Sequence, residues 1–304
     1  MVNSNILQFK RVSIEDKDFL NSFLKPYNLK THEFCFTNLY MWSEYCRIEY
    51  AVYKNCLIIK KRDALSFEDY FMQPVNYEKS NFQEIIDLII GLNKKYKFNY
   101  LFRDAEELFV KDLEELYPGM FKIDLDRDNS DYIFLKKDIA EYKKHKLHSK
   151  KRQMNQFIRN YKYNFTEINV TNIPDCIKFG RNIMEKKDAD KIQIYEMNAN
   201  IDLLSKFSQF DLIGVAVYVD SKVIGYIVGE KLNDLMVVVH IQKADTDYKG
   251  VYAFLKHMFA SSENLDGIEF INEEQDLGVE TLRNAKSQYC PVKLEPKYTV
   301  VLKN

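Results

Sequence analysis

The chain repeats itself at about half its length. Glu49–Lys60 reads EYAVYKNCLIIK and Gly214–Gly225 reads GVAVYVDSKVIG. Each segment carries Ala-Val-Tyr, then polar turn residues, then a run rich in β-branched residues, which predicts a β-hairpin. An α/β protein can show such echoes by coincidence. Two copies of one folding unit account for them better, because the elements that follow also match in order.

The order of the predicted elements is the same in both halves. After each hairpin we expect strand, helix, strand, helix and strand: 70–75, 82–96, 99–103, 106–116 and 131–136 in the first half; 235–242, 251–263, 267–272, 279–289 and 298–302 in the second. This order predicts a mixed α/β fold, in which twisted, partly antiparallel sheets are flanked by helices. It resembles the GCN5-related N-acetyltransferase (GNAT) fold in tandem. We predict one GNAT-like domain at 1–135 and a second at 136–304.

Composition excludes several classes of protein. The 304 residues carry a net charge of −1, with 9 Gly and 6 Pro, so neither a polyelectrolyte nor a low-complexity chain is expected. The five Cys form no C-x-x-C pair and indicate reduced thiols.

No apolar run approaches the roughly 20 residues of a transmembrane helix, and the start lacks a signal peptide. We therefore expect a cytoplasmic protein. No motif supports a metal site or nucleophile chemistry.

A basic segment occupies residues 136–162, with ten Lys or Arg against Asp138 and Glu141. Asp138–Glu141 resembles a capping box that opens a helix. Along that helix His148, Arg152 and Asn155 share one face, with Lys151 beside them. This surface suits phosphate groups of a nucleic acid, a nucleotide cofactor or a lipid. The alternative is a solvated helix face.

A glycine precedes the helix predicted at 251–263. A strand, a loop containing Gly250 and a helix N-terminus form the place where acetyltransferases bind the pyrophosphate of coenzyme A. Only Gly250 fits that family pattern, because Asp247 and Tyr252 replace its other residues. An ordinary turn is the alternative. The equivalent loop 76–81 of the first half lacks glycine, so we expect no cofactor site in the N-terminal domain.

Carboxylates cluster after the strand predicted at 267–272. Ligands of open α/β sheets sit at the carboxyl ends of strands. There, Glu274 and Asp276 could hold an ammonium group or act as general bases. Alternatively, they form a capped helix entry. Tyr289 ends the next helix as a candidate general acid, or packs under Pro291. The predicted site also includes Asn272, Arg283 and Lys286.

Four stretches together resemble one family. They are Phe36–Trp42 (FTNLYMW), Lys146–Phe157 (KLHSKKRQMNQF), Tyr248–Leu255 (YKGVYAFL) and Asn272–Lys286 (NEEQDLGVETLRNAK). The chain resembles the phosphatidylglycerol lysyltransferase C-terminal-like family, whose members carry tandem acetyltransferase-type domains. The resemblance implies kinship with Fem-type aminoacyl transferases, which take an aminoacyl group from a charged tRNA.

The leading hypothesis is an acyl- or aminoacyl-transferase without a tightly bound cofactor. An amine or hydroxyl of a small-molecule or lipid acceptor would attack an activated ester directly. Glu274 and Asp276 would orient or deprotonate an amine, while His148, Lys151, Arg152 and Asn155 would hold phosphates of tRNA. A second hypothesis uses acyl-coenzyme A as donor, with Gly250 at its pyrophosphate. A third is a non-catalytic binding protein that retains the fold.

Overall fold

The computed structural model describes residues 7–185 and 190–303. The chain forms two compact units. Unit 1 contains residues up to Ser130 together with residues from Glu295 onward, and unit 2 contains Asp131–Leu294. Each unit has its own seven-stranded sheet and its own hydrophobic core.

Unit 1 holds the elements of the first half and the last strand of the chain. They are β1 (Lys10–Arg11), α1 (Lys17–Tyr27), α2 (Phe36–Met41), β2 (Glu49–Tyr53), β3 (Cys56–Arg62), β4 (Asp69–Met72), α3 (Lys79–Tyr96), β5 (Phe102–Ala105), α4 (Glu107–Leu116), β6 (Phe121–Leu125) and β14 (Tyr298–Leu302). Short 3-10 helices of this unit are Ile14–Asp16 and His32–Phe34. The apolar face of α3 covers the sheet and places Ile85, Ile86 and Ile89 in the core.

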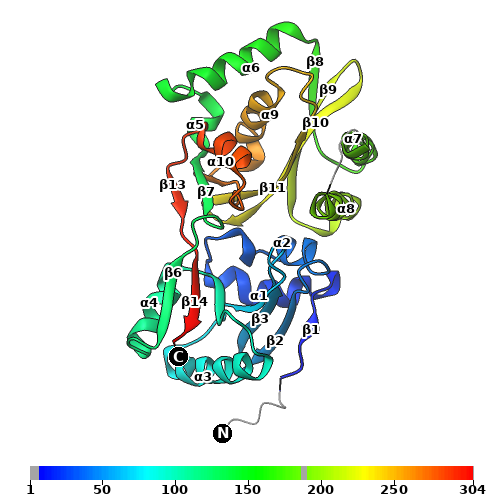
Figure 1. Ribbon diagram of the computed structural model, residues 1–304. Helices are drawn as coiled ribbons and strands as arrows, with labels where there is room; N and C mark the ends of the chain where they lie inside the picture. Colours follow the sequence, from blue (N-terminus) through cyan, green and yellow to red (C-terminus); the bar gives the residue numbers. More distant parts are fainter. Residues whose placement is uncertain (1–6, 186–189, 304) are drawn as a thin grey trace. The chain divides into compact units, whose positions relative to one another are not determined.

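Unit 2 begins with the strand that ends the first half. Its elements are β7 (Asp131–Leu135), α5 (Lys136–Glu141), α6 (His148–Asn160), β8 (Tyr163–Glu167), α7 (Ile173–Glu185), α8 (Lys191–Ser205), β9 (Leu212–Val219), β10 (Lys222–Asn233), β11 (Met236–Ala244), α9 (Val251–Ala260), β12 (Phe270–Asn272), α10 (Glu280–Ser287) and β13 (Lys293–Glu295). Short 3-10 helices of this unit are His145–Leu147, Phe207–Gln209 and Glu263–Leu265. Helices α6 and α9 lie on one side of the sheet, and α7 and α8 lie on the other (Figure 1).

The two sheets have the same strand order, which confirms the predicted tandem mixed fold. Unit 1 reads β1-β2-β3-β4-β5-β14-β6, and unit 2 reads β8-β9-β10-β11-β12-β7-β13. In each sheet the fourth and fifth strands are parallel, whereas the hairpins β2–β3 and β9–β10 are antiparallel. Both hairpins turn through two residues with positive φ, Lys54-Asn55 and Asp220-Ser221. This is the backbone geometry of a tight type I′ turn.

The last strand of each half lies in the sheet formed by the other half. Strand β7 pairs with β12, and β14 pairs with β5 and β6. The compact units therefore differ from the predicted halves at 1–135 and 136–304 by the exchange of these strands. The two strands have similar sequences, DYIFL and YTVVL. Because both are short runs of β-branched, aromatic and other apolar residues, the sequence alone does not show which sheet each strand joins.

The basic segment does not form one helix. Asp138–Glu141 lies inside α5 and does not open the helix that carries His148, so the predicted capping box is wrong. Helix α5 ends because Tyr142 adopts a left-handed conformation with φ of 46°. The Tyr142 side chain is buried, and its hydroxyl donates to the carbonyl oxygen of Ala253 at 3.0 Å. The buried ring and this hydrogen bond hold the turn between α5 and α6.

Candidate functional site

The candidate site lies where β12 ends in unit 2. The parallel pairing of β11 and β12 stops at the pair Val238–Asn272, while β11 continues to Ala244. Residues 273–279 leave the sheet at this point and lead to α10. The main chain changes direction sharply here, because Glu274 and Leu277 have φ of 59° and 56°. The predicted acidic cluster thus occupies the carboxyl end of a strand in the middle of the sheet.

Glu273 is buried and forms an ion pair. Both of its carboxylate oxygens contact the ammonium group of Lys256, which reaches across from α9. The side chains of both residues are only 7% exposed. A buried carboxylate is stable only when a partner balances its charge. Glu273 is therefore fully engaged by Lys256.

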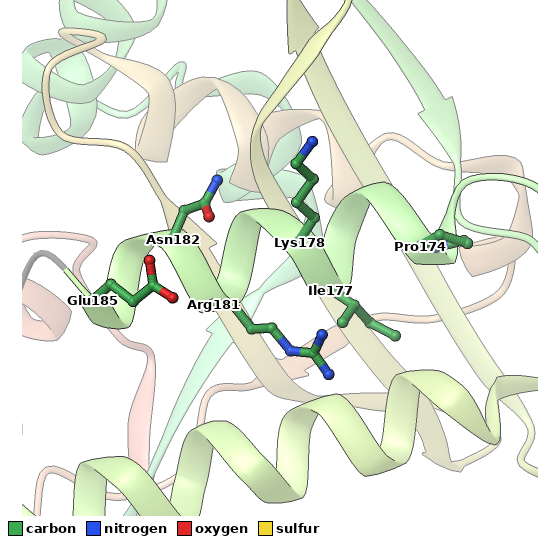
Figure 2. Close-up of a pocket in the computed structure, with 6 residues that line it drawn as sticks. All are labelled: Pro174, Ile177, Lys178, Arg181, Asn182 and Glu185. Atoms are coloured by element: carbon green, nitrogen blue, oxygen red, sulfur yellow. The ribbon is translucent and has the colours of Figure 1, made fainter.

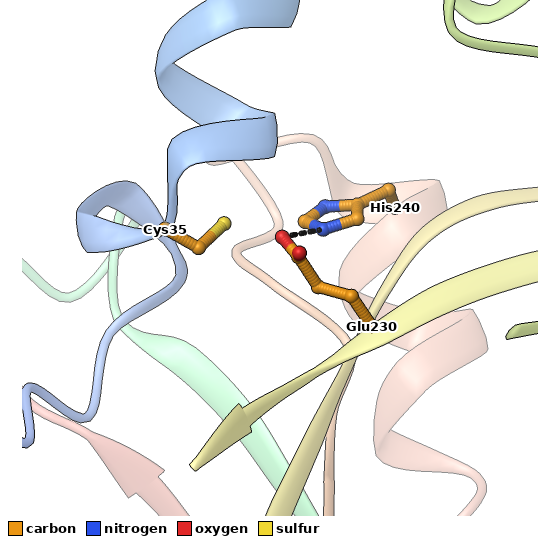
Figure 3. A group of neighbouring side chains, drawn as sticks. All are labelled: Cys35, Glu230 and His240. Carbon is orange, nitrogen blue, oxygen red and sulfur yellow. Dashed lines mark hydrogen bonds and ion pairs between the residues drawn. The ribbon is translucent and has the colours of Figure 1, made fainter. Parts of the chain in front are cut away.

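Glu274 is the accessible carboxylate of the cluster, with a quarter of its side chain exposed. Its Oε1 lies 3.1 Å from Nδ1 of His240, a residue of β11. The other ring nitrogen of His240 lies 3.1 Å from Oε1 of Glu230 (Figure 3). Which atom donates in each contact depends on the protonation of the ring and of the two carboxyl groups. His240 thus orients Glu274 through a buried imidazole.

Asp276 is completely buried and bonded on both oxygens. Oδ2 accepts from the Tyr132 hydroxyl at 2.7 Å, and Oδ1 accepts from the Gly278 amide at 2.9 Å. The Arg283 guanidinium donates to both oxygens at 3.1 Å. This arrangement locks the loop between β12 and α10. Asp276 and Arg283 are brought together as the sequence suggested, but the carboxylate faces the protein interior.

Asn272 and Lys286 hold the main chain beside Glu274. The Asn272 amide donates to Oδ2 of Asp131 at 2.8 Å, and its Oδ1 accepts from the Glu274 amide at 2.7 Å. Lys286 donates to the carbonyl oxygens of Glu273 and Gln275, at 2.5 Å and 2.6 Å. Burial lowers the pKa of Lys286, although the charges of Glu274 and Glu273 oppose that change.

Tyr289 lies just beyond α10 and is buried between two ammonium groups. Lys150 and Lys256 are 4.3 Å and 4.1 Å from the centroid of its ring. Such distances are typical of cation–π contacts. Burial, reinforced by the charge of Glu273, raises the pKa of Tyr289, so its hydroxyl keeps its proton at neutral pH.

The predicted phosphate-binding residues form a separate group on the surface of α6. His148, Lys151, Arg152 and Asn155 are all exposed. In the part of the chain that the structure describes, none of them forms a hydrogen bond or ion pair with the carboxylate cluster. The opposite side of α6 carries Met154 and Phe157 into the core.

Gly250 begins α9 with φ of 90° and lies against α6. A Cβ atom at this position would come within 2.1 Å of the carbonyl oxygen of Gln153. Nearby, the Tyr161 hydroxyl accepts from the Lys249 amide at 3.3 Å. Close packing of α6 on the start of α9 thus explains the glycine without a ligand.

A shallow depression of about 430 Å³ runs along α7, away from these residues. Figure 2 shows its lining, which comes from one helix: Pro174, Ile177, Lys178, Arg181, Asn182 and Glu185. This spacing marks a single helical stripe rather than groups that converge from several elements.

Among the described residues, no helix is long and apolar enough to cross a membrane.

Sequence reasoning missed Lys256, Lys150 and Tyr132, none of which belongs to the acidic segment. The sequence contains one indication that Lys150 is unusual. It falls on the apolar stripe Leu147, Met154 and Phe157 of the basic helix, where a charged residue is unexpected.

Comparison with known proteins agrees with this fold. A crystal structure of a conserved protein of unknown function from Bacteroides thetaiotaomicron shares 28% identity, with a TM-score of 0.86, over 98% of this chain and 100% of that chain. L-PGS from Bacillus licheniformis shares 11% identity, with a TM-score of 0.65, over 95% and 92%. FemX shares 8% identity, with a TM-score of 0.58, over 97% of both chains. No curated protein matches the chain.

The family comparison covers most of the sequence. The model of "Phosphatidylglycerol lysyltransferase, C-terminal" matches residues 25–301, which include the whole second sheet, most of the first sheet and the whole candidate site. The resemblance predicted from four short stretches is thereby confirmed. The chain belongs to the phosphatidylglycerol lysyltransferase C-terminal family.

Proposed function

We propose that the chain is an acyltransferase that moves an aminoacyl group from aminoacyl-tRNA to an amine or hydroxyl acceptor. The observation that carries this proposal is a half-buried carboxylate, Glu274, fixed at the end of β12 in a member of this family. The relatives named L-PGS and FemX have the same fold and support a transferase. The acceptor is a small molecule or a lipid.

Glu274 is the proposed general base. The acceptor nitrogen or oxygen attacks the carbonyl carbon of the aminoacyl ester and forms the new bond, while Glu274 takes its proton. The bond from that carbon to the ribose oxygen then breaks, and the ribose oxygen receives a proton. Tyr289 is protonated at neutral pH because burial raises its pKa, as a general acid at this step requires.

Asp276 has a positioning role in this proposal. Its oxygens already accept from Tyr132, Gly278 and Arg283. Together with Asn272 and Lys286 it keeps the loop rigid, so that Glu274 is held in one orientation. Rigid placement of a catalytic group lowers the cost of reaching the reactive geometry.

The exposed face of α6 is the proposed contact for tRNA phosphates, through His148, Lys151, Arg152 and Asn155. Arg and Lys on one helix neutralise backbone phosphates without reading sequence. Coenzyme A is the less favoured donor, because the α6 main chain fills the space beside Gly250.

Transfer assays test the proposal. The protein is incubated with amine and hydroxyl acceptors and either radiolabelled aminoacyl-tRNA or acyl-coenzyme A. We expect transfer from aminoacyl-tRNA, reduced roughly 10²–10⁴-fold by Glu274→Gln. Glu280→Gln, an exposed carboxylate of α10, is the matched control and should change little. Transfer from acyl-coenzyme A alone, or full activity in Glu274→Gln, would contradict the proposal.

Salt dependence tests the tRNA surface separately. Lys151→Ala combined with Arg152→Ala should weaken tRNA binding and reduce the salt slope by about 0.7–0.9 for each phosphate that the protein no longer neutralises. Stability should barely change, because both side chains are exposed. The control removes two exposed lysines of α3, Lys94 and Lys95. Equal slopes for the two double variants would show that α6 does not bind tRNA.

A further inference from the structure

The outermost strand of the first sheet, β6, has an open edge. Among the described residues it pairs with one strand, β14, and so ends the sheet of unit 1. Its even-numbered residues bond to β14, as the Asp126 amide does to the carbonyl oxygen of Lys297 at 2.8 Å. Residues that bond to a neighbouring strand alternate along an antiparallel pair. The N–H and C=O groups of Phe121, Ile123 and Leu125 therefore point away from the sheet.

Solvent reaches this edge. Lys122, Asp124 and Leu125 are exposed, and 58% of Leu125 is accessible. An open strand edge binds further strands unless charged side chains or proline protect it. Here the protection is weak, because Lys122 and Asp124 carry opposite charges and lie only 2.6 Å apart.

The sequence of β6 is complementary to itself. It reads Phe-Lys-Ile-Asp-Leu, with the two charges placed symmetrically about Ile123. When a second β6 strand lies antiparallel to the first, with Ile123 opposite Ile123, Lys122 of each chain lies opposite Asp124 of the other. Phe121 of each chain then lies opposite Leu125 of the other. Opposite charges and apolar pairs at directly opposed positions stabilise a sheet.

The charges also disfavour the neighbouring registers. Moving one strand by two residues places either Lys122 opposite Lys122 or Asp124 opposite Asp124, and like charges at opposed positions destabilise a pair. Moving it by one residue places outward-facing residues opposite residues that already bond to β14, so their hydrogen bonds are lost. Of these registers, the one centred on Ile123 alone combines opposite charges with matching hydrogen bonds.

We propose that β6 is a dimerisation edge, at which a second copy of this chain continues the sheet of unit 1 through an antiparallel β6–β6 pair. The backbone N–H and C=O groups of Ile123 bond to those of Ile123 in the other copy, and Phe121 and Leu125 bond to each other in the same way. The pair has a two-fold axis, so the contact closes and produces a dimer rather than a filament. This surface belongs to unit 1 and does not depend on the proposed transfer reaction.

Charge reversal tests the edge in the whole chain. Sedimentation velocity is measured between about 1 and 300 μM, because a short strand pair buries little area and predicts a weak dimer. The wild-type protein should form dimers in this range. Asp124→Lys and Lys122→Asp should each raise the dissociation constant at least about tenfold, because like charges then face each other. Asp234→Lys makes the same change at an exposed turn of unit 2 and should leave the dissociation constant unchanged.

Combining the two variants separates loss of the interface from loss of the fold. One variant has a doubly positive edge and the other a doubly negative edge, so an equimolar mixture should form heterodimers. The double variant Lys122→Asp with Asp124→Lys should dimerise like the wild-type protein. Hydrogen exchange at the amides of Phe121, Ile123 and Leu125 should slow as the wild-type concentration rises. The inference fails if the wild-type protein stays monomeric over the whole range, if Asp124→Lys dimerises as tightly as the wild-type protein, or if the mixture gives no heterodimer.

Discussion

At the scale of single residues, unit 1 contains a charge network in which the groups satisfy one another. Asp104 of β5 accepts from the Tyr70 hydroxyl at 2.8 Å and pairs with Lys61 at 3.1 Å. Arg103 pairs with Asp63 and Asp126, at 2.9 Å and 3.3 Å. Each of these charges has a partner within the unit. This network has the character of a structural core.

The charge network predicts sensitivity to acid. Burial alone would raise the pKa of Asp104, but the charges of Lys61, Lys297 and Arg103 outweigh burial and lower it to about 2. Because the folded pKa lies below the ordinary value of 3.8, the stabilisation is present above pH 4. It is lost as the pH falls toward 2 and is of the order of 2 kcal/mol.

Thermal unfolding between pH 5 and pH 2.5 measures this contribution. The Asp104→Asn variant should be less stable at neutral pH and should show a flatter decline in acid. Glu115→Gln, an exposed carboxylate of α4, is the control and should follow the wild-type curve. If the stability of Asp104→Asn declined with falling pH as steeply as that of the wild-type protein, other groups would be the cause of the acid sensitivity.

The sequence predicted which residues of the acidic segment gather, but not what they contact. Glu274, Asp276, Arg283 and Lys286 lie close together because they share a strand end and the next helix. Asp276 and Arg283 pair within the segment, whereas Tyr132, another partner of Asp276, comes from a distant strand. Contacts between residues more than a hundred positions apart leave no periodic pattern in a single sequence, so local spacing could not supply them.

At the scale of elements, the packing of α6 against α9 depends on Gly250. We predict that Gly250→Ala lowers the free energy of unfolding by at least roughly 1–3 kcal/mol, because alanine disfavours φ of 90° and its Cβ would meet Gln153. Chemical denaturation measures the loss. Gly91→Ala in α3 is the matched control, since no atom lies within 4 Å of its Cβ position. It should stabilise by about 0.5–1 kcal/mol. Equal changes in the free energy of unfolding at both sites would show that Gly250 has no packing role.

Elements defined by local rules were predicted well. The hairpins followed from turn residues between alternating strands, and the helices α3 and α9 from apolar periodicity. The break between α5 and α6 was not predictable, because it depends on Tyr142 burying its ring and bonding to Ala253. Tertiary packing decided the conformation at that residue, and helix propensity did not.

At the scale of the whole molecule, the exchanged strands make the two units unlike in chain continuity. Unit 2 is one uninterrupted segment, Asp131–Leu294, whereas unit 1 needs residues from both ends of the chain. Strand β7 supplies the buried side chains of Tyr132, Ile133 and Phe134 to unit 2. Each fully buried large side chain contributes roughly 1.5–3 kcal/mol. The strand is therefore a large part of the stability of unit 2.

Two fragments that differ only in β7 test this assignment. Residues 131–296 contain the complete second sheet, and residues 136–296 lack the strand that pairs with β12. We expect the longer fragment to unfold cooperatively on heating. The shorter fragment lacks the three buried side chains of β7, including the Tyr132 hydroxyl that donates to Asp276. It also leaves β12 without its neighbouring strand, which exposes an unpaired edge within the sheet. It should therefore show no cooperative transition, and hydrogen exchange should report little protection in β10 and β11. Equal stability of the two fragments would show that β7 is dispensable to unit 2, and that the division of the chain near residue 135 describes its folding better than the exchanged arrangement does.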